Sequence, residues 1–213
     1  MRTKRSRSPY LITLMGLVLT GTHGASGQSV DSTSILKREY CHVADSTLSA
    51  HPTHDEYVTA FGNLNACADR GATELARLWS APPADPAFRG ALVGATCQLS
   101  DLRITKVLEP IVVSSANPQR LRFDALAAFV GQFNPRLRVH IETPQQYRHS
   151  GLQLVDWGVV TSGVRNGTEP LDAAGKAEIL QTLRHLSSND PDPVMRSVAA
   201  RLVNGLSQGA YSH

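Results

Sequence analysis

The sequence predicts a mainly α-helical protein of about four antiparallel helix pairs with a small β-hairpin-like insertion. The helical prediction rests on short segments that begin with Asp-Pro or Asn-Pro and then place apolar residues at helical spacing. The insertion is indicated at about residues 134–172, where the apolar residues change to alternate spacing. A basic and then apolar N-terminus sets residues 1–27 apart from this domain.

The N-terminus has the pattern of a secretory signal peptide. Four of its first seven residues are basic, and an uncharged apolar run, YLITLMGLVLT, follows at 10–20 before the small residues GASG. We expect cleavage near Gly27, which leaves residues 28–213 as a single secreted or periplasmic domain. An uncleaved anchor is the alternative, although the run is short for a bilayer.

The charge of the expected mature chain argues against several partners. Removal of residues 1–27 leaves 17 basic against 18 acidic residues, a net charge of −1. A near-neutral chain gives no electrostatic reason to bind nucleic acid or an anionic membrane. No second long apolar run follows, so we do not expect an integral membrane protein after cleavage.

Three segments share one pattern, in which an apolar-Arg pair follows Asp-Pro or Asn-Pro by three or four residues. The pairs are Phe88-Arg89 in DPAFRGALVGA, Leu121-Arg122 in NPQRLRFDALAAF and Met195-Arg196 in DPVMRSVAARLV. Asp or Asn caps a helix, and Pro suits its first turn. A weaker copy centred on Tyr57 lacks the Arg, and the spacings are 31, 33 and 74 residues. The last spacing indicates a repeat plus an insertion.

Other amphipathic segments alternate with these helices, at about 33–50, 71–81, 101–115 and 174–187. Each is expected to form the first helix of a pair, with Pro110 kinking the third. The second helices, near 85–98, 118–132 and 192–206, should then lie on one common face.

These features resemble HEAT repeats over about residues 54–133 and 173–206. The resemblance implies a short α-solenoid, although a bundle of unrelated helix hairpins is an alternative. It also implies a structural ladder between the Asp and Arg residues of neighbouring second helices, here Asp85, Arg89, Arg122, Asp192 and Arg196, with Asn117 in place of one acid and Val58 in place of one Arg. These positions are expected to be structural and not to contact a ligand.

The insertion is expected to form a hairpin or extended flap. In RLRVHIE, the apolar Leu137, Val139 and Ile141 alternate with polar residues, and GLQLVDWGVV is a second strand candidate. Its recognition-type side chains are Tyr147, Arg148, His149 and Trp157, the candidate partner-binding cluster. Trp157 has a structural alternative, which is to pack the hairpin onto the helices. We expect that the flap can be shortened without unfolding the helices.

Metal binding and catalysis have weaker support. His51, His54, Asp55 and Glu56 lie together in HPTHDE and could suit zinc, but acids in the first turn of a helix already interact favourably with its dipole. The sequence contains none of H-E-x-x-H, G-x-S-x-G, G-x-G-x-x-G and C-x-x-C. No cofactor, metal site, catalytic residue or enzymatic activity is therefore expected.

Three cysteines, Cys41, Cys67 and Cys97, suit a compartment in which disulfides persist. Cys67 and Cys97 lie 10 and 9 residues after equivalent positions of consecutive second helices, so a bond between them is expected. A Cys41–Cys67 bond across the first helix pair is the competing arrangement.

The function expected from the sequence is that of an exported scaffold that binds a protein or peptide. Stacked helix pairs create extended concave surfaces, which suit binding more than catalysis. The alternatives are a metal-dependent or accessory enzyme component that uses the His51/His54 region, and an envelope structural protein without a soluble ligand.

Overall fold

The structure is a computed structural model that describes residues 69–135, 137–142, 155–159 and 170–209, together with Glu56, Ala60 and Cys67. All of these residues belong to the second of two compact units of the chain, Asp31–His213. For residues 156–159 only the backbone is described. Within these ranges the fold is mainly α-helical, with six helices and one two-stranded sheet.

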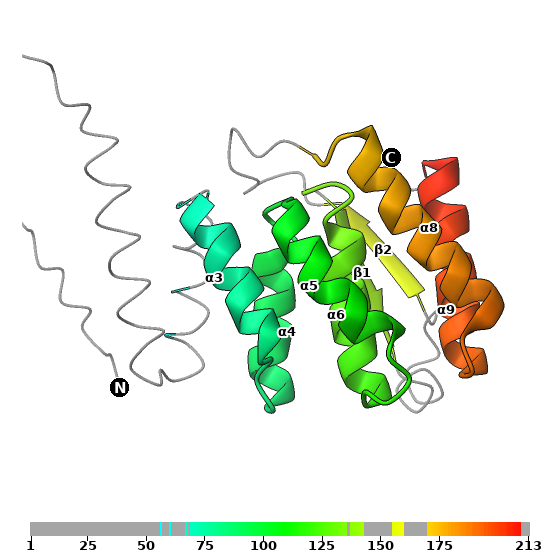
Figure 1. Ribbon diagram of the computed structural model, residues 1–213, viewed down its shortest axis with the longest axis horizontal. Helices are drawn as coiled ribbons and strands as arrows, with labels where there is room; N and C mark the ends of the chain where they lie inside the picture. Colours follow the sequence, from blue (N-terminus) through cyan, green and yellow to red (C-terminus); the bar gives the residue numbers. More distant parts are fainter. Residues whose placement is uncertain are drawn as a thin grey trace, which may run out of the picture. The chain divides into compact units, whose positions relative to one another are not determined.

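The helices follow one another in pairs (Figure 1). Helices α3 (Asp69–Ser80) and α4 (Pro86–Thr96) come first, then α5 (Leu102–Val113) and α6 (Gln119–Gly131), and last α8 (Ala173–Asn189) and α9 (Pro193–Gln208). Each lies within a few residues of a helix predicted from the sequence. The first predicted helix pair falls almost wholly outside the described residues.

The Asp-Pro segments begin helices for the expected local reason. Asp85 accepts a hydrogen bond from the Ala87 N–H at 2.7 Å, and Asp192 accepts one from the Val194 N–H at 2.8 Å. Each Asp is the N-cap residue, and the following Pro occupies the first turn. The prediction of capping is wrong for Asn117, because Pro118 is the N-cap of α6 and the Asn117 amide donates to the carbonyl of Ile111 instead.

The contacts between first helices repeat along the chain, whereas those between second helices do not, because α9 contacts strand β2 (Val155–Val159) where an α6 contact would be expected. First helices contact first helices, α3 on α5 and α5 on α8, and α4 contacts α6. Within the first pair, the buried indole of Trp79 on α3 donates a hydrogen bond to the Thr96 hydroxyl on α4 at 2.8 Å. The prolyl residue of α5, Pro110, lies in the last turn of the helix, so the helix continues to Val113.

The insertion forms the predicted hairpin. Strand β1 (Leu137–Ile141) pairs antiparallel with β2 (Val155–Val159), and Val139 lies opposite Trp157. The alternation of β1 is confirmed, because Leu137, Val139 and Ile141 are buried whereas His140 is exposed.

The described strands of the insertion pack into the core, whereas the expectation that the insertion can be shortened without unfolding the helices stays a prediction. Strand β1 packs on α6, and β2 contacts α9, so the hairpin lies between these two helices (Figure 1). The buried side chains of both strands belong to the same hydrophobic core as the helices. Removal of the hairpin would expose this apolar surface to water, which is energetically unfavourable.

Helix α6 is consequently covered around its circumference. It contacts α4, α5 and β1, and every residue from Arg122 to Gly131 is buried. A helix buried on all sides cannot offer a face to a partner. The open surface of the central pair is therefore on α5, where Leu102 and Val113 are exposed.

Candidate functional site

Helices α5 and α8 run side by side in the same direction. A Cβ atom placed on Gly175 would lie 3.3 Å from Cδ1 of Leu102, so the two helices approach closely near their N-terminal ends. Seven residues further along both helices, the Thr182 hydroxyl donates a hydrogen bond to Oε1 of Glu109 at 2.6 Å. The same seven-residue advance on both helices means that they are parallel.

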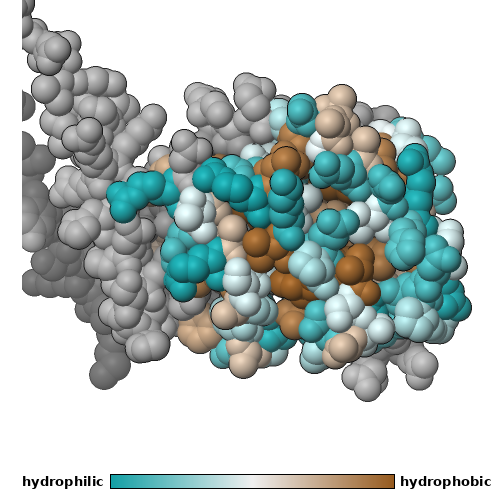
Figure 2. Space-filling view, viewed as in Figure 1, coloured by the Kyte–Doolittle hydropathy of each residue, from teal (hydrophilic) through white to brown (hydrophobic). Residues whose placement is uncertain are grey.

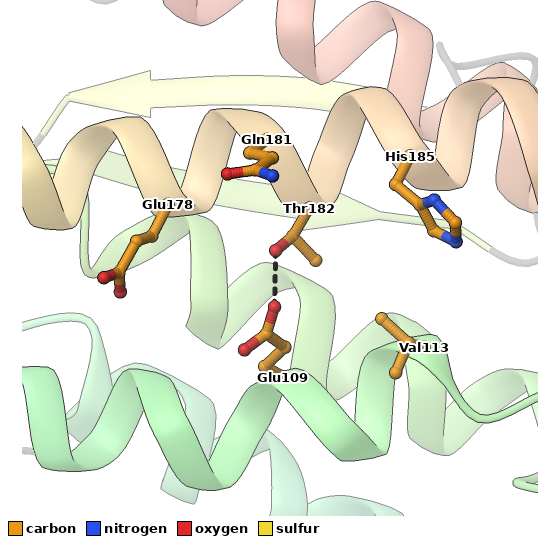
Figure 3. Close-up of a pocket in the computed structure, with 6 residues that line it drawn as sticks. All are labelled: Glu109, Val113, Glu178, Gln181, Thr182 and His185. Carbon is orange, nitrogen blue, oxygen red and sulfur yellow. Dashed lines mark hydrogen bonds between the residues drawn. The ribbon is translucent and has the colours of Figure 1, made fainter.

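A hollow of about 310 Å³ lies between these two helices (Figure 3). Helix α5 contributes two lining residues and helix α8 contributes four, which are Glu109, Val113, Glu178, Gln181, Thr182 and His185. Figure 2 shows the same side of the molecule, where apolar surface emerges between polar side chains over the helices. The hollow combines two carboxylates, the hydrogen-bonding side chains of Gln181, Thr182 and His185, and one apolar side chain, Val113.

Helical geometry explains why these residues meet. Glu109 and Val113 are four residues apart, so they lie on one side of α5. Glu178, Thr182 and His185 are spaced by four and three residues, which places them on one side of α8. Glu109 and Glu178 point into the space between the helices, whereas Val113 and His185 lie toward its other end (Figure 3).

The two carboxylates have few partners within the described part of the chain. Glu109 accepts the hydrogen bond of Thr182, and neither Glu109 nor Glu178 forms an ion pair with a described residue. At the other end, Nδ1 of His185 lies 3.3 Å from the side-chain nitrogen of Asn189. At one end of the hollow lie two carboxylates that form no ion pair with a described residue, and at the other end the apolar side chain of Val113 lies beside the His185 ring.

A metal site does not arise from these groups. Glu178 and His185 are seven residues apart on one helix, a separation of roughly 10 Å along its axis. In the described ranges, no three His, Cys, Asp or Glu side chains are grouped in a way that could hold a metal ion. His51 and His54 lie outside those ranges, so the zinc alternative at HPTHDE stays untested.

The predicted partner-binding cluster is mostly outside the described residues. Tyr147, Arg148 and His149 fall there, and for Trp157 the structure places only the backbone, in β2.

The predicted ladder residues are all described, and their partners differ from those expected. Arg89 forms an ion pair with Asp124 of α6 at 3.0 Å. Arg122 forms a buried, bidentate ion pair with Asp190 at the end of α8. The expected acids have other roles, since Asp85 caps its own helix and Asp192 accepts a hydrogen bond from Gln119 at 2.6 Å besides capping. Pairs of helices are therefore joined by Arg–Asp contacts through acids that the sequence pattern did not identify.

Two of these arginines also share a local geometry. Arg89 donates to the carbonyls of Pro83 and Ala84, and Arg196 donates to those of Asp190 and Pro191. In both cases the carbonyls lie six and five residues before the arginine. This common geometry agrees with the alignment of these two segments in the sequence.

The expected Cys67–Cys97 disulfide is wrong. Cys67 is disulfide-bonded, but Cys97 is a free, buried cysteine. The Cys97 thiol lies against α6, 3.7 Å from the carbonyl of Ala127, and burial raises its pKa to about 11 although Arg138 acts in the opposite direction. The spacing of the two cysteines in the sequence did not reveal this, because it does not show that the Cys97 side chain is directed into the packed α4–α6 contact. The remaining cysteine of the sequence, Cys41, lies outside the described residues.

The sequence and the structure were compared with known proteins. No protein-family model, no curated protein and no solved structure matches the chain. None of the helices in the described ranges combines the length and the apolar character needed to cross a bilayer.

The sequence reasoning missed the hollow. The polar stripe of Glu178, Thr182 and His185 is visible in the sequence as a helical pattern, but such stripes are common on solvated helix faces. Only the position of α5 beside α8 distinguishes this stripe, and those helices are separated by the insertion.

Proposed function

We propose that this chain is an exported, HEAT-like α-solenoid that binds a partner protein or peptide and has no catalytic activity of its own. The basic and then apolar N-terminus supports export to the periplasm or the exterior. The recurring Arg–Asp contacts between consecutive helix pairs support the solenoid arrangement, since stacked repeats pair their internal polar groups with those of their neighbours.

The observation that carries the proposal is the open hollow between α5 and α8. The hairpin and neighbouring helices cover α6, which leaves the first helices as the accessible side of the central pair. Exposed apolar side chains beside polar groups with free hydrogen-bonding capacity are typical of recognition surfaces. We therefore favour the α5–α8 hollow over the second-helix side as the binding surface.

Affinity capture with matched variants tests this proposal. The purified protein is immobilised and exposed to an envelope extract of its own source, beside the variants Gln181→Trp and Asn204→Trp. Gln181 is exposed at the hollow, whereas Asn204 is exposed on α9, so each Trp adds bulk without entering the core.

The expected result is a protein or peptide that the wild-type chain and Asn204→Trp retain and that Gln181→Trp does not. Circular dichroism should give the same helical content for all three proteins. Equal capture by both variants would show that the hollow is not the binding surface, and no specific capture by the wild type would contradict the binding function itself.

A further inference from the structure

We propose that the α5–α8 hollow binds an extended peptide that carries a Lys or Arg and, two positions away, an apolar side chain. This inference rests on the proposed binding function and specifies the chemistry of the partner. It depends on the charge of one end of the hollow, on the apolar surface at its other end and on the distance between them.

The charge favours a cation. Glu109 and Glu178 are exposed carboxylates on opposite sides of the hollow (Figure 3). The hydrogen bond from Thr182 uses one oxygen of Glu109 and holds that side chain in place, and the second oxygen has no hydrogen-bond partner within the described residues. An ammonium or guanidinium group between the two carboxylates would make charge-assisted hydrogen bonds to both.

The cations already present on these helices do not fill this role. Arg103 is engaged by Asp101. On α8, Lys176 lies over the Phe133 ring, 5.4 Å from its centroid, and Arg184 is rotated by about 120° from the side that carries Glu178. Lys106, one turn before Glu109 on α5, is exposed and forms no ion pair with a described residue. Among the described residues, no cation forms an ion pair with Glu109 or Glu178, so both carboxylates can interact with a cation of the partner.

The apolar surface lies at a distance that suits an extended chain. Val113 is 40 % exposed and follows Glu109 by four residues, which is about 6 Å along the helix. In an extended peptide, residues i and i+2 point to the same side and are about 6.6 Å apart. A Lys or Arg beside Glu109 therefore places the side chain two residues away beside Val113.

The size of the hollow agrees with this occupant. Its volume of about 310 Å³ is at the small end of ligand sites, which suits two side chains and not a large folded element. From Glu178 to His185 its wall on α8 extends over roughly 10 Å, the length of about three extended residues.

Fluorescence anisotropy with labelled pentapeptides tests the inference. The probe is Ala-Lys-Ala-Leu-Ala with a blocked C-terminus and an N-terminal fluorescein, measured at low ionic strength and at neutral pH. Three comparison peptides replace Lys with Gln, replace Lys with Glu, or move Leu next to Lys. We expect the Lys probe to bind about tenfold more tightly than the Gln peptide and more tightly than the peptide with adjacent Lys and Leu.

Variants of the protein locate the interaction. Glu109→Gln with Glu178→Gln removes both charges and retains an oxygen acceptor for Thr182, and it should weaken binding of the Lys probe about tenfold. Glu74→Gln, which changes a glutamate on α3, should leave binding unchanged. Glu178→Lys should reverse the preference, so that the Glu peptide binds more tightly than the Lys probe.

Each alternative outcome contradicts the inference. Equal binding of the Lys, Gln and Glu peptides would contradict recognition by charge. If the Lys probe does not bind at about 1 mM, an extended peptide of this kind is not the ligand of the hollow. If either occurs while Gln181→Trp still abolishes capture of a natural partner, the binding function stands and only the assigned chemistry fails. If the peptides fail in this way and Gln181→Trp also leaves capture of a natural partner unchanged, the binding function is contradicted as well.

Discussion

At the scale of single residues, close contacts inside the helix pairs leave little room for larger side chains. Gly131, at the end of α6, lies against Cys97 at the end of α4, and a Cβ atom placed on Gly131 would lie 2.4 Å from the Cys97 sulfur. Both residues are buried, so the surrounding core cannot move aside freely. A glycine is therefore required here for packing.

We expect Gly131→Ala to lower the free energy of unfolding by about 1–3 kcal/mol through overpacking. The loss should be smaller in a Cys97→Ala background, because the sulfur atom that is nearest to the added methyl is then absent. Gly90→Ala is the matched control, since a Cβ there meets no atom within 4 Å and alanine favours the helix. Urea unfolding measures all of these variants, and a loss of equal size at Gly90 would contradict the packing argument.

Asp101 links helix capping to pH. It caps α5, and hydrogen bonds from the Arg103 side chain hold the pKa of the Asp101 carboxyl below its ordinary value. A carboxylate with a lowered pKa stabilises the folded state above the unfolded-state pKa, near 4, and this contribution is lost as the pH falls through the folded-state pKa.

Asp101→Asn should therefore reduce the free energy of unfolding at pH 7 by less than about 1 kcal/mol, since the ion pair is partly exposed and Asn still caps the helix. The difference from wild type should be smaller at pH 3, which lies below the unfolded-state pKa, because the carboxyl of the unfolded chain gains a proton there and the contribution of the lowered pKa decreases. Urea unfolding at both pH values checks this, and a difference that does not depend on pH would exclude the charge as its cause.

At the scale of elements, the hairpin determines which surface remains open. Its buried strand residues pack on α6 and α9, so the insertion contributes to the core and is not an appendage. The hairpin thereby covers α6, whereas the hollow between α5 and α8 remains exposed.

Substitutions in β1 test this role. Leu137→Ala should lower the free energy of unfolding by about 2–5 kcal/mol, because Leu137 is 1 % exposed. His140→Ala, in the same strand but facing solvent, should change it by less than about 0.5 kcal/mol. Thermal unfolding of both variants is the measurement, and a small effect at both positions would support the interpretation as a separable flap.

Local chemistry accounts for what the sequence could predict of these elements. Asp85 and Asp192 cap helices through neighbouring N–H groups, and the alternation of β1 is a property of adjacent residues. The partners of Arg89 and Arg122 lie 35 and 68 residues away and could not be read from spacing. For the same reason the free state of Cys97 was missed, and so was the hollow, which needs α5 beside α8.

At the scale of the whole molecule, Arg122 joins three elements. From α6 it donates to the carbonyl of Val112 on α5 at 2.8 Å and pairs with Asp190 between α8 and α9. Both charged side chains are almost fully buried. Removal of one partner would leave the other as an uncompensated buried charge, which is strongly unfavourable.

Arg122→Met should therefore lower the free energy of unfolding by about 3–5 kcal/mol. Adding Asp190→Asn should recover part of that loss, because the unpaired charge is removed. Arg77→Met, which breaks an exposed ion pair with Glu74, should cost less than about 1 kcal/mol. Guanidinium unfolding of these variants decides the matter, and additive losses in the double variant would contradict direct coupling between Arg122 and Asp190.

We propose the surface formed by α5 and α8 as the recognition surface of the whole molecule. The most direct test of this proposal is a two-dimensional amide NMR titration of the isotope-labelled protein with the Ala-Lys-Ala-Leu-Ala peptide. We expect the largest shift changes on residues 109–113 and 178–185, and we expect Glu109→Gln with Glu178→Gln to require about tenfold more peptide for the same changes. Shift changes concentrated on β1, β2 or α9, with these residues unaffected, would contradict it.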